Sequence, residues 1–247
     1  MGNNNVAIRV ENASVRFNMA SEKIDSLKEY AIKLVRRELM FQEFFALRNI
    51  DLTIRQGESW AFVGRNGAGK STLLKLISRI LTPYEGKVTV HGSIAPMIEL
   101  GAGFDPNLTA EENIYINGCI MGHSIQFMRE HFDEIVEFAQ LQDFLKMPIK
   151  NYSSGMRARL GFAVATMVKP DILIVDEVLA VGDASFRKRC NERMKEMLSG
   201  GTTLLFVSHS NADVRALCEN AVWLDHGQIK AVGTAGEICT AYEATVK

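Results

Sequence analysis

A strand–loop–helix pattern in the first third of the chain restricts the fold more than any other feature. The short apolar run Trp60 to Val63 leads into Gly-Arg-Asn-Gly-Ala-Gly-Lys-Ser-Thr at positions 64–72. Leucines and isoleucines at helical spacing then continue to Leu81, ahead of a proline. The segment G-x-x-x-x-G-K-S between a buried strand and a helix is typical of a phosphate-binding loop. A chance glycine-rich turn is the alternative, and the flanking strand and helix disfavour it.

The chemistry of this loop follows from its residue types. Glycines let backbone N–H groups curl around phosphate oxygens, and the N-terminus of the following helix adds a positive dipole. Lys70 is expected to reach the β- and γ-phosphates, Ser71 to hold Mg²⁺, and Thr72 to assist at the α-phosphate. ATP is the expected nucleotide because no guanine-reading N/T-K-x-D segment occurs. The residues expected to bind the nucleotide here are Gly64, Arg65, Asn66, Gly67, Ala68, Gly69, Lys70, Ser71 and Thr72.

A second apolar run supplies the carboxylates that a hydrolytic site needs. Ile172 to Val175 reads as a buried strand, and Asp176 and Glu177 follow it directly. Asp176 is expected to bind Mg²⁺ through a water molecule. Glu177 is expected to take a proton from the attacking water or to polarise it. The alternative is a strand followed by a solvated acidic turn, which the four preceding apolar residues disfavour.

Composition limits the remaining classes. The 247-residue chain has a net charge of -1 and is 47% hydrophobic, which indicates a large core and no general nucleic-acid-binding or membrane-coating surface. Its four cysteines form no C-x-x-C pair, so a zinc site or redox dithiol is not expected, and a reduced cytosolic context fits. The N-terminus predicts no signal peptide, and the apolar run Gly161 to Val168 is too short to span a bilayer. Any membrane role is therefore expected to depend on a partner.

Periodicity predicts the other elements of an α/β core with a helical insertion. Residues 6–17 and 47–54 read as strands, and 110–168 as mostly helical after a capping box at Thr109 to Glu112. Residues 204–208 read as a buried strand, and 221–232 as a hairpin turning at His226-Gly227. Residues 21–45 fit an amphipathic helix, which either packs on the core or faces another protein or the lipid headgroups.

The stretch Tyr152-Ser153-Ser154-Gly155-Met156 lies 21 positions before Asp176, measured from Gly155. Alone it reads as an N-capped helix, but in this register it resembles the L-S-G-G-Q signature motif of ATP-binding-cassette (ABC) proteins. Ser153 and Gly155 hold the expected positions, whereas Ser154 and Met156 depart from the motif. The resemblance implies that Ser153, Ser154 and Gly155 contact the γ-phosphate of ATP bound to a partner subunit, so that two cassettes enclose two ATP molecules head to tail.

Four further positions follow from the same resemblance. His209 is similar to the switch histidine that contacts the γ-phosphate, and Asp183 to the D-loop aspartate that touches the other subunit. Phe17, at the expected end of the first strand, is similar to the aromatic residue that stacks on adenine. Where the family has a Q-loop glutamine this chain has none, and Glu99 is the expected substitute as an Mg²⁺ or water contact.

Residues 98–114, 151–156 and 176–186 resemble the ATP-binding subunits of bacterial exporters of O-antigen, capsular polysaccharide and teichoic acid. This implies a P-loop NTPase (RecA-like) core over residues 6–95 and 168–247, with an N-terminal antiparallel β subdomain and an inserted α-helical subdomain over 96–167. The helix expected at 21–45 resembles one near the membrane interface in that group, and the C-terminal carbohydrate-binding domain of some members is expected to be absent.

The resemblance also implies the partners and the function. We expect a homodimer of ATPase subunits, bound to two integral-membrane subunits at the cytoplasmic face of the bacterial membrane, that powers export of a lipid-linked polysaccharide or teichoic acid. Two alternatives remain: a drug or small-lipid transporter, or a soluble ABC ATPase acting on ribosomes or DNA. The single cassette, the absence of sustained heptads and the lack of a basic face disfavour the last.

Overall fold

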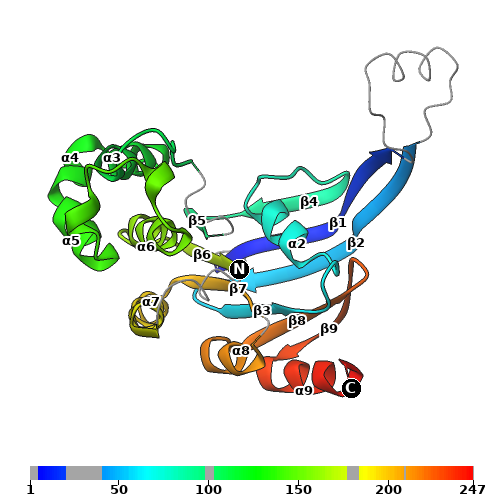
Figure 1. Cartoon of the computed structure of the whole chain (residues 1–247). Helices are drawn as coiled ribbons and strands as arrows, with labels where there is room; N and C mark the ends of the chain where they lie inside the picture. The colour runs from blue at the N-terminus through cyan, green and yellow to red at the C-terminus, as the bar shows by residue number, and fades with distance from the viewer. Residues whose placement is uncertain (1–4, 21–40, 98–102, 177–183, 209, 247) are drawn as a thin grey trace, which may run out of the picture.

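Two β-sheets form the centre of the molecule (Figure 1). The computed structural model describes residues 5–20, 41–97, 103–176, 184–208 and 210–246. An antiparallel sheet has the strand order β2 (Phe41–Arg55), β1 (Val6–Ala20) and β4 (Glu85–Val90). A second sheet has the order β5 (Ile94–Met97), β6 (Ile172–Asp176), β7 (Thr203–Val207), β3 (Ser59–Val63), β8 (Asn220–Asp225) and β9 (Gln228–Thr234).

Strands β5, β6, β7, β3 and β8 of the second sheet run parallel, and β9 returns antiparallel to β8. The turn between β8 and β9 falls at His226 and Gly227, which confirms the predicted hairpin. The central strands are buried on both faces: Ile172 and Ile174 of β6 enter one hydrophobic core, and Leu173 and Val175 enter the other. This two-sided burial explains the uninterrupted apolar runs in the sequence, which are typical of parallel strands covered by other layers.

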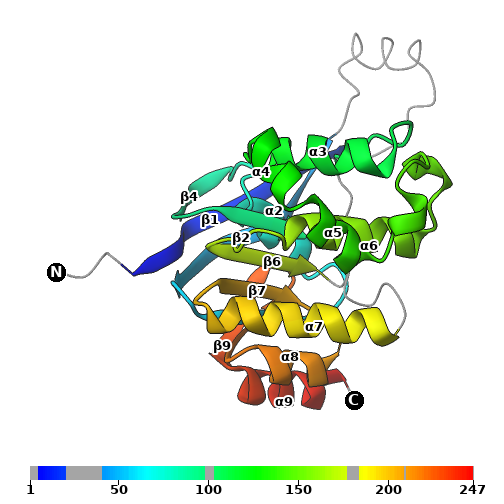
Figure 2. The ribbon, with the colours of Figure 1, turned by 90° about the vertical axis from the view of Figure 1, so that its left-hand side faces the viewer.

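Helices cover both faces of the parallel sheet. On one face α2 (Lys70–Ile77) packs between the two sheets and buries Leu73, Leu74, Leu76 and Ile77. On the other face lie α7 (Ala184–Ser199), α8 (Asn211–Leu217) and α9 (Ala235–Val246), which Figure 2 shows side by side. The carboxyl ends of β3 and β6 therefore remain at one edge of the sheet, where ligands bind in open α/β sheets.

Four helices between β5 and β6 form a separate group with its own hydrophobic core (Figure 1). They are α3 (Ala110–Ile120), α4 (Ile125–Glu130), α5 (Phe132–Ala139) and α6 (Ser154–Ala165), with short 3₁₀ turns η1 (Gln142–Phe144) and η2 (Ile149–Asn151). The predicted capping box is confirmed: the Thr109 side chain accepts from the Glu112 amide, and the Glu112 carboxylate accepts from the Thr109 amide. Among the helices that the structure describes, none combines the length and apolarity needed to cross a membrane.

The prediction of a helix over residues 21–45 is wrong at its C-terminal end. Residues 41–45 begin β2, where Phe41 pairs with Ala20 and Phe45 pairs with Arg16 on β1. Edge-to-face packing of the Phe45 ring against Tyr84 also favours the strand, with ring centroids 6.3 Å apart. Residues 21–40 lie outside the described part of the chain. Phe17 falls inside β1, three residues before its end, and not at the strand terminus as predicted.

Candidate nucleotide-binding site

The loop between β3 and α2 has a backbone that only glycine fits at two positions. Gly64 has φ 148°, and a Cβ there would collide with the carbonyl oxygen of Leu224. Gly69, the N-cap of α2, has φ 103°, and its Cβ would lie 2.8 Å from the carbonyl oxygen of Ala46. Both glycines therefore serve close backbone packing as well as the left-handed conformation. The loop is thereby held against the β8–β9 hairpin and β2.

Lys70 is the first residue of α2, and its side chain is almost entirely buried. Its ammonium donates to the carbonyl oxygens of Gly64 at 2.8 Å and Arg65 at 3.0 Å. The charge therefore lies inside the curve of the loop, whose N–H groups continue into the helix N-terminus. A fixed cation beside the N-terminus of a helix is the donor set that phosphate oxygens require.

Ser71 and Asp176 meet at the carboxyl edge of the parallel sheet. Ser71 is the second residue of α2, which follows β3, and Asp176 ends β6, with β7 between the two strands. The Ser71 hydroxyl donates to the Asp176 carboxylate at 3.1 Å. A hydroxyl and a carboxylate at this separation are hard oxygen donors suited to Mg²⁺, so the residues present fit that ion. The structure thus brings together the two residues that the sequence assigned to the metal.

The signature-like stretch forms the start of α6. Ser153 is the N-cap, and its hydroxyl oxygen accepts from the Met156 amide at 3.1 Å. Among the described residues, a Cβ on Gly155 would meet only the Ser153 Oγ, at 3.8 Å, so neither their packing nor the backbone conformation requires glycine there. Tyr152 anchors the stretch: its hydroxyl donates to the Phe144 carbonyl at 2.8 Å, and burial raises its pKa to about 12. The exposed face of this helix start is therefore open to a molecule outside the subunit.

Phe17 and Phe44 pair directly across β1 and β2, so their rings lie on the same face of the hairpin. They are 40% and 47% exposed, although large aromatic rings are usually buried. A cavity of about 440 Å³ adjoins this face and reaches the phosphate loop at Gly67; Phe44, Arg48 and Gln228 also line it. The sequence pattern did not identify Phe44 as a site residue, because it predicts a helix over residues 41–45.

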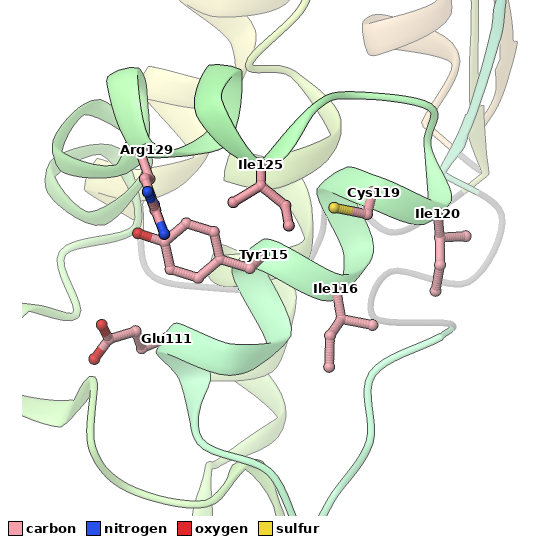
Figure 3. A pocket seen from close by; sticks show the side chains of 7 residues that line it. All are labelled: Glu111, Tyr115, Ile116, Cys119, Ile120, Ile125 and Arg129. Carbon is pink, nitrogen blue, oxygen red and sulfur yellow. The ribbon is translucent and has the colours of Figure 1, made fainter.

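An apolar groove on the helical group was not predicted from the sequence (Figure 3). The groove has a volume of about 800 Å³ and lies between α3 and α4. Figure 3 shows Ile116, Ile120 and Ile125 along it, with Arg129 beside Tyr115 at one end. Ile120 and Ile125 are 69% and 56% exposed. The one available signal was the spacing of Ile116 and Ile120, which places two isoleucines on one helix face.

Four residues assigned from the sequence lie outside the described part of the chain: Glu99, Glu177, Asp183 and His209. The elements that adjoin these residues in the chain are described. Asp176 precedes Glu177 at the carboxyl edge of β6, and Ala184, at the start of α7, follows Asp183. His209 follows β7 by two positions. The remaining assigned residues fall into the phosphate loop with the first turn of α2, the end of β6, the start of α6 and the β1–β2 hairpin.

Comparison with known proteins agrees with this geometry. The sequence pattern of the family described as "ABC transporter" matches residues 47–180. The O-antigen export system ATP-binding protein RfbB of Klebsiella pneumoniae is 45% identical over 82% of this chain and 82% of its own length. The teichoic acids export ATP-binding protein TagH of Listeria monocytogenes is 36% identical over 98% of this chain and 71% of its own length.

A solved dimeric structure of the ATP-binding cassette MJ0796, bound to ADP and Pi, superimposes with a TM-score of 0.74 at 21% identity. It covers 92% of this chain and 98% of the other. The fold is thus an ABC cassette, a P-loop NTPase with an antiparallel β subdomain and a helical subdomain. The matched family pattern and the extent of identity together show that this chain belongs to the ABC transporter family as an ATP-binding, ATP-hydrolysing subunit.

Proposed function

We propose that this subunit powers export of a lipid-linked polysaccharide, of O-antigen or teichoic-acid type, across the cytoplasmic membrane. The observation that carries the proposal is the level of identity to export subunits of both kinds: 45% to an O-antigen protein and 36%, over almost the whole chain, to a teichoic-acid protein. The two cargoes share a chemistry, a long hydrophilic polymer on a lipid carrier. Export of this class of polymer is therefore the common expectation.

In this proposal the phosphate loop binds ATP through the backbone amides of residues 64–72, and Lys70 neutralises charge on the β- and γ-phosphates. The buried position of Lys70 supports the role, because its charge is held against loop carbonyls and requires little reorganisation when phosphate enters. Thr72 assists at the α-phosphate. Phe17 stacks on the adenine, and Phe44, on the same face, borders the base.

Ser71 and Asp176 would hold Mg²⁺, and Glu99 would take the role of the Q-loop glutamine. When bound, Mg²⁺ neutralises charge on the phosphate oxygens and orients them. Glu177 accepts the proton of the attacking water or polarises that water, and His209 contacts the γ-phosphate. The position of Asp176 at the end of β6 supports the assignment of Glu177, because the next residue leaves the strand at the same edge as the phosphate loop.

Two copies of the chain form a head-to-tail dimer around two ATP molecules. Ser153, Ser154 and Gly155 contact the γ-phosphate held by the partner, and Asp183 contacts the partner subunit. The open space above Gly155 supports this arrangement, because within the described part of the chain only the Ser153 Oγ comes within 4 Å of a Cβ placed there. ATP binding closes the dimer and hydrolysis reopens it.

Two integral-membrane subunits carry the polymer, and the groove of α3 and α4 receives a short cytoplasmic helix from one of them. The exposed isoleucines of the groove favour an amphipathic helix as the partner. Glu111 and Arg129 at the margin of the groove provide one negative and one positive charge that can orient that helix. The subunit then lies at the cytoplasmic face of the membrane.

We further propose residues 6–95 and 168–247 as the catalytic core and 96–167 as the helical subdomain. The separate hydrophobic core of α3 to α6 supports this division.

The proposal is tested in the native host by replacing Glu177 with Gln at the chromosomal locus. Lipid-linked polymers are extracted from the cytoplasmic side and analysed by mass spectrometry, alongside surface polymer. One glycan or teichoic-acid polymer is expected to accumulate inside and disappear from the surface. Glu192→Gln, on the exposed face of α7, is the matched control and is expected to export normally.

Normal polymer inside and outside, with a confirmed ATPase defect in Glu177→Gln, would contradict polymer export. In that case stimulation of the assembled transporter by a drug or small lipid, tested next, would assign the alternative cargo. Rapid ATP hydrolysis by the Glu177→Gln protein would instead remove Glu177 from its assigned role. The two results are distinguishable because one is a measurement of polymer and the other of phosphate release.

A further inference from the structure

Phe138, near the end of α5, packs against two hydrophobic cores at once. One is the core of the helical group, which includes Leu160 and Val164 of α6. The other lies between the parallel sheet and α7 to α9, and includes Phe162 and Phe186. A single side chain that joins two packed bodies transmits displacement between them, because close-packed interiors are poorly compressible.

The ring of Phe138 is fixed by two other phenylalanines. It stacks on Phe162 of α6 with ring centroids 5.7 Å apart and an interplanar angle of 16°. It meets Phe186 of α7 edge-on at 5.8 Å. Phe162 and Phe186 in turn contact each other at 6.2 Å, and both are almost completely buried. The three rings therefore form a closed cluster that joins α5, α6 and α7.

Two arginines of α7 hold the outer side of the same ring. The guanidinium carbons of Arg189 and Arg193 lie 4.9 Å and 5.3 Å from the Phe138 centroid, within the range of cation–π contacts. Arg193 also donates to Glu134 of α5 at 2.6 Å. Glu134 and Phe138 are four positions apart on α5, as are Arg189 and Arg193 on α7, so each pair shares one helix face. The contact is therefore one helix face against another.

The two helices that meet at Phe138 carry different halves of the nucleotide chemistry. Helix α6 begins directly after Ser153, whose expected contact is with ATP on the partner subunit. Helix α7 begins one residue after Asp183 and seven residues after Glu177. The distance along the chain from Phe138 to either segment is large, yet the aromatic cluster connects both within one packing unit.

We propose that Phe138, clamped by Arg189 and Arg193, is a positioning residue that couples the placement of the signature helix α6 to that of α7, which begins one residue after Asp183. When α6 engages nucleotide on the partner, the cluster shifts α7 with it and sets the geometry for hydrolysis. Phe138 touches neither nucleotide nor metal and acts through α7. The inference rests on the proposed roles of Ser153 and Glu177 but not on the cargo.

The test uses the whole 247-residue chain. It measures the steady-state rate of ATP hydrolysis and, separately, the melting temperature of each variant. Phe138→Ala is expected to lower kcat roughly tenfold while the KM for ATP changes by less than about twofold, because the phosphate loop is intact. Phe138→Tyr keeps the ring and is expected to retain kcat. The matched control is Phe144→Ala, in the same helical group at a ring that is 40% exposed. An unchanged kcat in a folded Phe138→Ala protein would overturn the proposal, as would a rise in KM alone.

The exposed ion pair supplies a second test that does not open a cavity. Glu134→Arg and Arg193→Glu each place like charges across the contact and are expected to lower kcat. The double variant restores the opposite charges and keeps the Arg189 contact with the Phe138 ring, so its kcat is expected to exceed that of either single variant. Equal loss in the single and double variants would overturn the coupling. A failure of this test leaves the polymer measurement in the Glu177→Gln strain unaffected, so the two proposals are judged separately.

Discussion

The Ser71 hydroxyl donates to the Asp176 carboxylate at 3.1 Å, although 105 positions separate the two residues in the chain. Ser71 lies in the first turn of the helix after β3 and Asp176 ends β6, and the parallel sheet aligns the carboxyl ends of both strands. The contact places a hydroxyl and a carboxylate where one Mg²⁺ can be shared. The charge of Asp176 is the part of this arrangement that can be changed without changing its shape.

Asp176→Asn is expected to lower ATPase activity about 10- to 100-fold and to raise the Mg²⁺ concentration needed for half-maximal rate, because the amide retains an acceptor but loses the negative charge. A magnesium titration of phosphate release measures both. Asp171→Asn, at the opposite end of β6, is the control and should keep its activity at neutral pH. Equal magnesium dependence in the wild type and Asp176→Asn would contradict the assignment.

Gly155→Ala separates folding from function at the signature-like stretch. Gly155 is the second residue of α6 and has open space around it, so alanine should stabilise the folded protein by up to about 1 kcal/mol. ATPase activity should fall, because the added methyl group occupies the surface expected to meet the partner's nucleotide. Thermal unfolding and phosphate release give the two values.

Gly236→Ala is the matched control for that experiment. Gly236 is likewise the second residue of its helix, α9, and a Cβ there meets nothing within 4 Å. It should raise stability by a similar amount and leave ATPase activity unchanged. Full activity of a stably folded Gly155→Ala protein would show that the open face of α6 does not meet nucleotide, whereas a loss of stability would contradict the open space around Gly155.

Phe17→Ala is expected to raise the KM for ATP by roughly 5- to 100-fold, since stacking of a base on an aromatic ring contributes about 1–3 kcal/mol. Tyr84→Ala is the control: Tyr84 is also exposed but packs with Arg16 and Phe45, on the other face of the hairpin. Its KM should stay near the wild-type value. A larger effect of Phe44→Ala than of Phe17→Ala would transfer the stacking role to Phe44.

Cys119 should be the one thiol that reacts in the folded protein. Burial raises the pKa of the Cys190 and Cys218 thiols to about 12, and it also raises the pKa of the buried Cys239 thiol. Cys119 is exposed in the groove of α3 and α4. Maleimide titration should therefore label one site natively and all four cysteines in denaturant.

Labelling at Cys119 also tests the groove. The modified subunit should hydrolyse ATP at its normal rate when isolated but fail to assemble with the membrane subunit, because the adduct fills the space between the isoleucines. Cys119→Ser should assemble even after maleimide treatment. Normal assembly of the labelled wild type would place the membrane contact elsewhere on the subunit.

The sequence predicted the local parts of the site because each depends on neighbouring residues. The phosphate loop combines glycines, a lysine and a helix start within nine positions, and Asp176 follows its own buried strand. Residues 41–45 were assigned wrongly because Phe41, Phe44 and Phe45 have the spacing of a helix face. These residues form a strand because they pair with β1, and the spacing of apolar residues in one sequence does not show which strand will be the partner.

The groove and the Phe138 cluster could not be predicted for a related reason. Phe138, Phe162 and Phe186 lie on three helices and look like ordinary core residues in their separate segments. Only the tertiary arrangement of α5, α6 and α7 brings their rings together with Arg189 and Arg193. Long-range contacts between side chains of common types leave no local pattern in one sequence.

Asp171 should contribute to the acid stability of the fold. Hydrogen bonds from the backbone amide of Ser93, at 2.7 Å, and from its hydroxyl, at 2.8 Å, hold the pKa of the Asp171 carboxyl below its ordinary value of 3.8. The folded state therefore favours the ionised form. This stabilisation is complete above the unfolded-state pKa and is lost as the pH falls through the lower folded-state pKa.

Asp171→Asn should consequently be less stable than the wild type at neutral pH, and the difference should shrink as the pH falls from about 5 to about 2. Urea unfolding across that pH range measures the difference. Asp133→Asn, at an exposed position in the first turn of α5, is the control and should follow the wild-type curve more closely. A gap between Asp171→Asn and wild type that stays constant with pH would mean that the carboxylate charge is not what ties β6 to the loop before β5.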